Sequence, residues 1–189
     1  KVTTPVHVVD KATKLQTLHD RIHEVDVRWE VVKRDALVRQ WQAIAQGVDA
    51  AQAQAQCAAF CTQCDADRNF LHRANLGGER MAEADVQRVR QIGSSYRWQT
   101  PAGTEAALLS DEEIDNLIVR AGTLNAAERE TINHHIVATI KMLQSLPWPQ
   151  HLQNVPEYAG GHHERMDGKG YPNGLRREQM SWQARMMGI

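Results

Sequence analysis

The chain has 189 residues and a formal net charge of −1, so we expect one domain, or one domain with a sizeable insertion. Its basic and acidic residues are interleaved, which argues against nucleic acid and against an anionic membrane as partners. No apolar run reaches the roughly 20 residues of a membrane span, and the first ten residues lack a signal-peptide layout. We therefore expect a cytoplasmic chain, with any membrane tether elsewhere in a longer protein.

Apolar residues recur every three or four positions from Leu15 to Ala36. This spacing predicts one helix of about eight turns that ends at Gly47. The apolar stripe from Leu15 to Val32 packs on the chain's own core, or it forms the seam of a homodimer. We favour internal packing.

Residues 47–109 differ in character, and we interpret them as a helical insertion in a simpler domain. We predict an Ala/Gln-rich helix to about residue 72, a break at residues 77–78, a short helix around 82–92 and a loop over 93–103. Cys57, Cys61 and Cys64 have the spacing of the radical S-adenosylmethionine cluster motif. They share one face of a predicted helix, so we read them as small buried apolar residues. A structural metal held with His72 is the alternative.

Two helices should begin at residues with capping-box spacing, Ser110 with Glu113 and Asn125 with Glu128. The second helix should run to about residue 145. On it, His135 falls on the apolar stripe, as either a core histidine or a metal ligand, whereas the neighbouring His134 falls on the polar face. No alternating pattern predicts a strand, so the fold class is all-α.

Residues 162–175, HHERMDGKGYPNGL, place two adjacent histidines before a glycine-rich double turn. Adjacent histidines are poor core residues because each buried imidazole needs partners for two nitrogens, so we predict metal ligands. Neighbouring side chains on a helix diverge by about 100°. We therefore expect His162 and His163 to serve different ions of one cluster, with the turn from Asp167 to Gly174 closing the site.

This stretch resembles the HHExxDGxGYPxGL signature of the HD-GYP phosphodiesterases, with all ten fixed positions present. The resemblance extends over residues 123–189 and, more loosely, over residues 1–15. It implies a partial HD-domain-like helical bundle over residues 1–189, with a first segment to residue 46, the insertion over 47–109 and the ligand helices over 110–189. It also implies that the chain begins just after the His-Asp pair and stops before another ligand aspartate, so we expect it to be incomplete for catalysis.

The resemblance implies metal-dependent hydrolysis of cyclic di-GMP to pGpG or GMP in bacterial second-messenger signalling. Two or three transition-metal ions would activate water, with iron or manganese expected and nickel, zinc or cobalt as alternatives. His135, His162 and His163 are the expected ligands, and Lys1 is the expected catalytic contact to a substrate phosphate. The alternatives are an inactive binding or regulatory module, and a phosphohydrolase of another cyclic nucleotide.

The loop residues have weaker assignments. Glu164 and Asp167 orient the histidines, shape the turn or bind metal directly, and we favour the first two roles over the third. Gly168 belongs to the same turn and is grouped with them as a substrate-binding or supporting residue. Tyr171 and Pro172 line the substrate cleft, present a surface to a diguanylate-cyclase (GGDEF) partner, or pack on each other. A sensory domain is expected elsewhere in the full-length protein.

Overall fold

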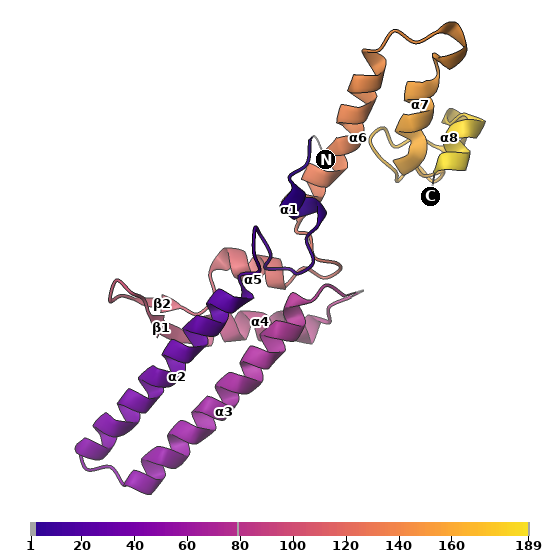
Figure 1. Cartoon of the computed structure of the whole chain (residues 1–189). Coiled ribbons are helices and arrows are strands. Elements are labelled where there is room, and N and C mark those ends of the chain that lie inside the picture. Colours follow the sequence, from indigo (N-terminus) through magenta and orange to yellow (C-terminus); the bar gives the residue numbers. More distant parts are fainter. Residues whose placement is uncertain (1–2, 79, 189) are drawn as a thin grey trace. The chain divides into compact units, whose positions relative to one another are not determined.

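The computed structural model describes residues 3–78 and 80–188, which form two compact units. One unit contains residues up to Val9 together with Ala126 onwards, and we call it the histidine unit. The other spans Asp10–Asn125, and we call it the hairpin unit (Figure 1). The predicted all-α class is confirmed, because the described residues contain a single sheet of two short strands. No described helix combines the length and apolar character needed to cross a bilayer.

The hairpin unit is built on two long helices, α2 (Ile22–Ala45) and α3 (Ala50–Asn75), which lie side by side (Figure 1). The remaining elements are α4 (Glu83–Ser95), β1 (Arg97–Gln99), β2 (Glu105–Ala107) and α5 (Asp111–Leu117). The buried residues of α2 keep the predicted spacing of threes and fours, and Trp29 meets the ring of Tyr96 edge-on at 4.6 Å. The α2 stripe therefore packs within its own unit, as we favoured.

The predicted start of the long helix at Leu15 is wrong, because α2 begins at Ile22. Leu15 is fully buried but lies in a turn, where its backbone N–H donates to the Asn75 side chain at 2.8 Å. Asp20 then accepts from the Ile22 N–H at 3.0 Å and from the Asn75 amide at 2.9 Å. These polar contacts to the end of α3 compete with the helical backbone pattern, and Leu18 is left exposed.

The predicted loop over residues 93–103 is also wrong in its first part, since α4 continues through Ser95. Gly93 lies inside this helix, and Ile114 packs closely against it, with its side chain 2.7 Å from the position that a Cβ would take. Residues 97–99 of the predicted loop form β1, which pairs with β2 in an antiparallel hairpin, with Trp98 opposite Ala106. The capping box at Ser110 and Glu113 is confirmed by reciprocal hydrogen bonds of 3.2 and 2.8 Å.

The cysteines of α3 do not form a metal site with His72. Cys57 and Cys64 are buried, and burial raises the pKa of the Cys64 thiol to about 12. His72 instead contacts the Asp26 carboxylate at 2.7 Å. Among the described residues, the one group of His, Cys, Asp or Glu side chains that converges closely enough for a metal ion lies in the histidine unit. Cys57 and Cys64 therefore pack as small buried apolar residues, as predicted, whereas Cys61 is only partly buried.

In its described residues, the histidine unit combines four helices with three short 3₁₀ turns. The helices are α1 (Val6–Val9), α6 (Ala126–Gln144), α7 (Val155–Gly160) and α8 (Trp182–Met187), and the 3₁₀ turns are Gln150–Leu152, Gly161–His163 and Arg177–Gln179. Helix α7 packs on α6 and on α8. The Gly160–Gly161 pair permits this, since a Cβ at Gly160 would lie 3.0 Å from Ile140 and one at Gly161 would lie 2.6 Å from Ala184.

Candidate metal centre

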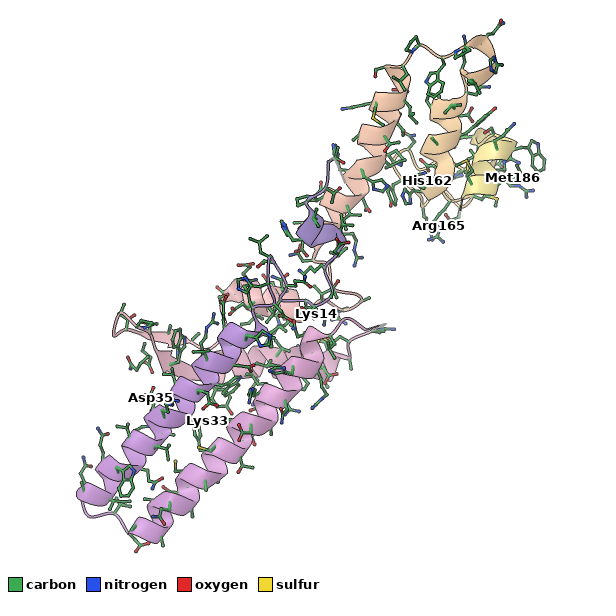
Figure 2. All side chains as sticks on the ribbon, viewed as in Figure 1. Lys14, Lys33, Asp35, His162, Arg165 and Met186 are labelled. Atoms are coloured by element: carbon green, nitrogen blue, oxygen red, sulfur yellow. The ribbon has the colours of Figure 1, made fainter. Side chains whose placement is uncertain are left out.

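Three histidines from two segments of the histidine unit converge on one point. His135 comes from the middle of α6, whereas His162 and His163 come from the 3₁₀ turn that follows α7. Figure 2 labels His162 at the end of α7. One nitrogen from each ring lies within 4.8 Å of the others. His134, the neighbour of His135, is exposed to solvent, so the helical-face prediction selected the histidine that joins the cluster.

Backbone carbonyl oxygens fix the tautomers of two of these rings. His135 Nδ1 lies 2.5 Å from the oxygen of Ile132, and His162 Nδ1 lies 2.6 Å from the oxygen of Ala159. A carbonyl oxygen can only accept a hydrogen bond, so each Nδ1 carries the proton. Each neutral ring therefore presents the lone pair of its Nε2 atom, the form in which histidine binds a metal.

His163 is held by the glycine-rich loop. Its ring stacks on Tyr171, with centroids 4.7 Å apart and planes 13° from parallel, and its carbonyl oxygen accepts from the Tyr171 N–H at 3.1 Å. Burial lowers the pKa of His163 below its ordinary value, and the charges of His162 and His135 act in the same direction. The neutral ring that a metal requires is thus the favoured form.

The spacing of the nitrogens fits a shared cation. His163 Nε2 lies 3.1 Å from His135 Nε2, whereas two ligands on a tetrahedral ion with metal–nitrogen bonds of 2.0–2.1 Å would be about 3.3 Å apart. His162 would supply the third nitrogen, to the same ion or to an adjacent one. A metal bound here would act as a Lewis acid on a phosphoryl oxygen and lower the pKa of water. The protein's own contribution is to bring one nitrogen from each of the three rings together.

The expectation that His162 and His163 serve different ions rested on one regular helix that includes both residues. That helix is wrong, because α7 ends at Gly160 and a 3₁₀ turn covers Gly161–His163, whereas the assignment of the two rings to different ions stays a prediction. The two rings lie with centroids 4.0 Å apart and face the same point as His135. The helix break thus brings the two neighbouring ligands together.

Glu164 organises the loop. Its side chain is almost fully buried, at 1% exposure, and its two carboxylate oxygens accept from the N–H groups of Asn173 and Leu175 at 2.7 and 2.8 Å. Both oxygens are therefore engaged with the backbone and turned to the loop. These contacts favour a structural role for Glu164 over direct metal ligation. In that role the carboxylate anchors the far end of the loop that follows His163.

The other loop residues form the turn. Asp167 is exposed, and its carboxylate accepts from the Lys169 N–H at 2.9 Å, while Gly168 has a positive φ of 78°. Gly170 lies against the backbone of Glu164 and Arg165 so closely that any Cβ would overlap it. Pro172 is half-buried beside Tyr171. Lys1, the predicted phosphate contact, lies outside the described residues.

Comparison with known proteins places this arrangement in a family. A model of the HD domain matches residues 78–189, which is more than half of the chain and includes all three histidines. The chain belongs to the HD domain family. It is also similar to 3′3′-cGAMP-specific phosphodiesterase 3 of Vibrio cholerae, with 33% identity over 86 residues. That match covers 43% of this chain and 18% of the relative, and no solved structure matches significantly.

Membership of this family supports a metal-dependent phosphohydrolase, and the histidine cluster supplies a fitting set of ligands. The sequence pattern had identified all three histidines. It had not identified the two carbonyl groups that fix their tautomers, because backbone acceptors leave no trace in residue identity. Tyr171 was named, but its stacking on His163 follows only from the folded loop.

Proposed function

We propose that this chain carries the metal-binding core of an HD-GYP phosphodiesterase that hydrolyses cyclic di-GMP. The observation that carries the proposal is the convergence of the ring nitrogens of His135, His162 and His163 within 4.8 Å beside the glycine-rich loop. The ten signature positions over residues 162–175 and the HD-domain match support it. Iron or manganese is the proposed metal because the family resemblance implies it, and nickel, zinc or cobalt is the alternative because the described cluster consists of three histidines.

A second substrate is favoured by a specific observation. The relative from Vibrio cholerae is named for 3′3′-cGAMP, another cyclic dinucleotide with the same two phosphodiester linkages. Attack on phosphorus by activated water serves either substrate, so the metal centre does not distinguish them. Selectivity would come from contacts to the bases. We place cyclic di-GMP first because the HD-GYP signature is complete.

The first test measures metal rather than turnover. Metal content by mass spectrometry should fall in His135→Ala, His162→Ala and His163→Ala, and should be unchanged in the exposed control His134→Ala. Circular dichroism should show the same helical content in all four variants. If the three cluster variants keep the metal of the parent chain, the histidines serve only the fold and the proposal is wrong.

The second test measures hydrolysis by the longest gene product that contains these residues. With Mn²⁺ or Fe²⁺ present, cyclic di-GMP should yield pGpG or GMP, and His162→Ala should abolish the product. 3′3′-cGAMP is assayed in parallel. If it is hydrolysed faster than cyclic di-GMP, 3′3′-cGAMP becomes the preferred substrate in the proposal. A protein that binds metal and cyclic dinucleotide without any product would instead be a regulatory module.

A further inference from the structure

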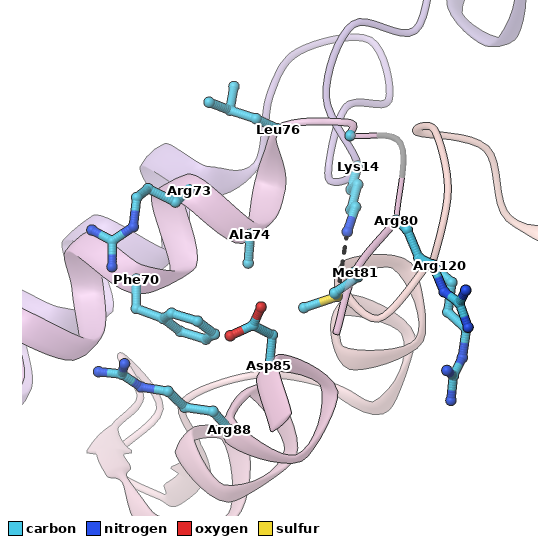
Figure 3. A pocket seen from close by; sticks show the side chains of 11 residues that line it. Lys14, Phe70, Arg73, Ala74, Leu76, Arg80, Met81, Asp85, Arg88 and Arg120 are labelled. Atoms are coloured by element: carbon cyan, nitrogen blue, oxygen red, sulfur yellow. Dashed lines mark hydrogen bonds between the residues drawn. The ribbon is translucent and has the colours of Figure 1, made fainter. Parts of the chain in front are cut away.

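We propose that the hairpin unit contains a second ligand site, a cationic pocket that takes a small phosphorylated polyol. We define the cationic pocket by Lys14, Phe70, Arg73, Arg80, Asp85 and Arg88, which line a cavity of about 350 Å³ (Figure 3). A volume of that order suits a small organic ligand. All of these residues belong to the hairpin unit, so the site is separate from the histidine cluster and does not depend on its proposed function.

A buried lysine is the first reason to expect an anion. Lys14 is 3% exposed, and its ammonium donates to the Leu117 carbonyl oxygen at 2.9 Å and faces the Met81 sulfur at 3.6 Å. Both partners are uncharged, and among the described residues no carboxylate lies within ion-pair distance of Lys14 Nζ. Burial lowers the pKa of Lys14, while the negative charge of Asp85 opposes that change. A bound anion would compensate the buried charge.

Two arginines at the mouth of the pocket add charge that is not neutralised. Arg73 and Arg80 are exposed, and neither pairs with a carboxylate in the part of the chain that the structure describes. Figure 3 shows them on either side of the Asp85 carboxylate. Among the described residues that line the pocket, they and Lys14 give three unpaired cations against one anion, an excess that suits the charge of a phosphate monoester.

The other two cations of the cavity are already compensated. Arg88 pairs with Asp67 at 3.0 Å, and its guanidinium lies over the Phe70 ring at 4.3 Å. Arg120 pairs with Glu83 at the surface. The recognition of an anion therefore falls to the unpaired side chains, and the face of Phe70 that Arg88 covers is not open to a stacked base.

The mouth of the pocket is held in place by the backbone. The Met81 N–H donates to the Arg120 carbonyl at 2.7 Å, and the Gly122 N–H donates to the Gly78 carbonyl at 3.0 Å. Gly77 fits under Thr123, where a Cβ would lie 2.6 Å from the threonine methyl group. Because these bonds hold Gly78 and Met81 in place, binding would cost little ordering at these two positions.

Asp85 narrows the class of ligand. Its carboxylate lies inside the cavity and would repel a phosphate placed against it. It would instead accept a hydrogen bond from a hydroxyl group of the same ligand, while the arginines hold the phosphate. A sugar phosphate carries both groups at a separation of a few bonds. Inorganic phosphate carries only one of them, and a free sugar only the other.

The experiment is calorimetric titration of the 189-residue chain with ribose 5-phosphate, inorganic phosphate and ribose. Ribose 5-phosphate should bind most tightly, and Arg73→Gln or Arg80→Gln should each weaken it about tenfold or more. Arg39→Gln removes the same charge from an exposed site on α2 and should change nothing. Asp85→Asn should weaken ribose 5-phosphate but strengthen inorganic phosphate.

Two outcomes would overturn the proposal. One is the absence of binding by either phosphate probe at millimolar concentration and low salt. The other is an equal loss of affinity in Arg39→Gln and Arg80→Gln, which would indicate a response to net charge rather than to a pocket. Arg73 and Arg80 are both exposed, so their replacement should leave the fold unchanged. Circular dichroism of each variant verifies this before titration.

Discussion

The Tyr171 ring lies nearly parallel to the His163 ring, with a centroid separation of 4.7 Å and an angle of 13° between planes. The tyrosine also donates its backbone N–H to the carbonyl oxygen of His163 at 3.1 Å. Two contacts from one residue thus set both the position and the rotation of this imidazole. The glycine-rich loop is joined to the histidine cluster through this pair.

We predict that Tyr171→Leu weakens metal binding by about 10- to 100-fold, because partners that orient a ligand affect affinity to that extent. Tyr171→Phe keeps the ring and should bind metal like the parent chain. Competition of each variant with a chelating dye for Mn²⁺ or Zn²⁺ measures the difference. Equal affinities for the leucine and phenylalanine variants would show that stacking does not position His163.

We predict that Glu164→Gln destabilises the histidine unit by about 1–3 kcal/mol. The carboxylate accepts hydrogen bonds from two backbone N–H groups. The glutamine side chain would place its own NH₂ group against one of those N–H groups, so one hydrogen bond would be lost. Urea unfolding followed by circular dichroism measures the change. Glu157→Gln is the control because that side chain is exposed on α7, and it should have little effect.

We predict that Gly170→Ala disrupts the loop, because a Cβ there would overlap the backbone of Glu164 and Arg165. The expected results are lower stability and weaker metal binding, since the loop carries Tyr171. Gly78→Ala adds the same methyl group where nothing lies within 4 Å and should be tolerated. A fully stable Gly170→Ala protein with parental metal affinity would contradict the described loop geometry.

We predict that the Arg28–Glu113 pair stabilises the hairpin unit above pH 4.5 and progressively less below it. Burial raises the pKa of Glu113, but hydrogen bonds from Arg28 and from the Ser110 N–H outweigh it, so the pKa lies below its ordinary 4.5. With a lowered folded pKa, the contribution is present above the unfolded value and is lost as pH falls through the folded value.

The test of this pair is urea unfolding of the parent chain and Glu113→Gln between pH 7 and pH 3. The variant should be less stable at pH 7, and its deficit should shrink as the pH falls below 4.5. Glu112→Gln removes a neighbouring exposed carboxylate and should show no such convergence. A constant difference across the range would mean that Glu113 does not titrate with folding.

We predict that Ile22→Glu unfolds the hairpin unit, at a cost of about 4 kcal/mol or more, because Ile22 is 4% exposed in its core. Val27→Glu is the control, since Val27 is 63% exposed on the same helix. Circular dichroism and sedimentation distinguish unfolding from loss of a dimer. A folded, monomeric Ile22→Glu protein made from a dimeric parent would favour the homodimer seam instead.

The sequence pattern predicted elements whose signals are local. The capping box at Ser110 and Glu113 needs only residues three apart, and the buried stripe of α2 needs only helical spacing. The start of α2 could not be predicted in this way. It depends on Asp20 and Leu15 meeting Asn75, which is more than fifty residues away in the chain.

In the candidate site, too, the residue types were predictable from the sequence, whereas their positions in space depend on tertiary packing. Residue type and spacing selected His135, His162 and His163, because few other roles suit adjacent histidines. Their convergence depends on the end of α7 at Gly160, where close packing against Ile140 requires glycine. The cationic pocket was not predicted, since its residues come from separate segments and no single segment of the sequence is strongly basic.

Helix α1 ends at Val9 and packs against α6, which begins at Ala126, so the two partners are synthesised at different times. A ribosome adds about 5–20 residues per second, so α1 emerges on the order of ten seconds before its partner helix exists. The hairpin unit is complete within that interval and can fold first. Chains that end at Asn125 and are carried clear of the ribosome by a flexible C-terminal linker should therefore resist protease in α2, α3 and α5 while α1 is still cleaved.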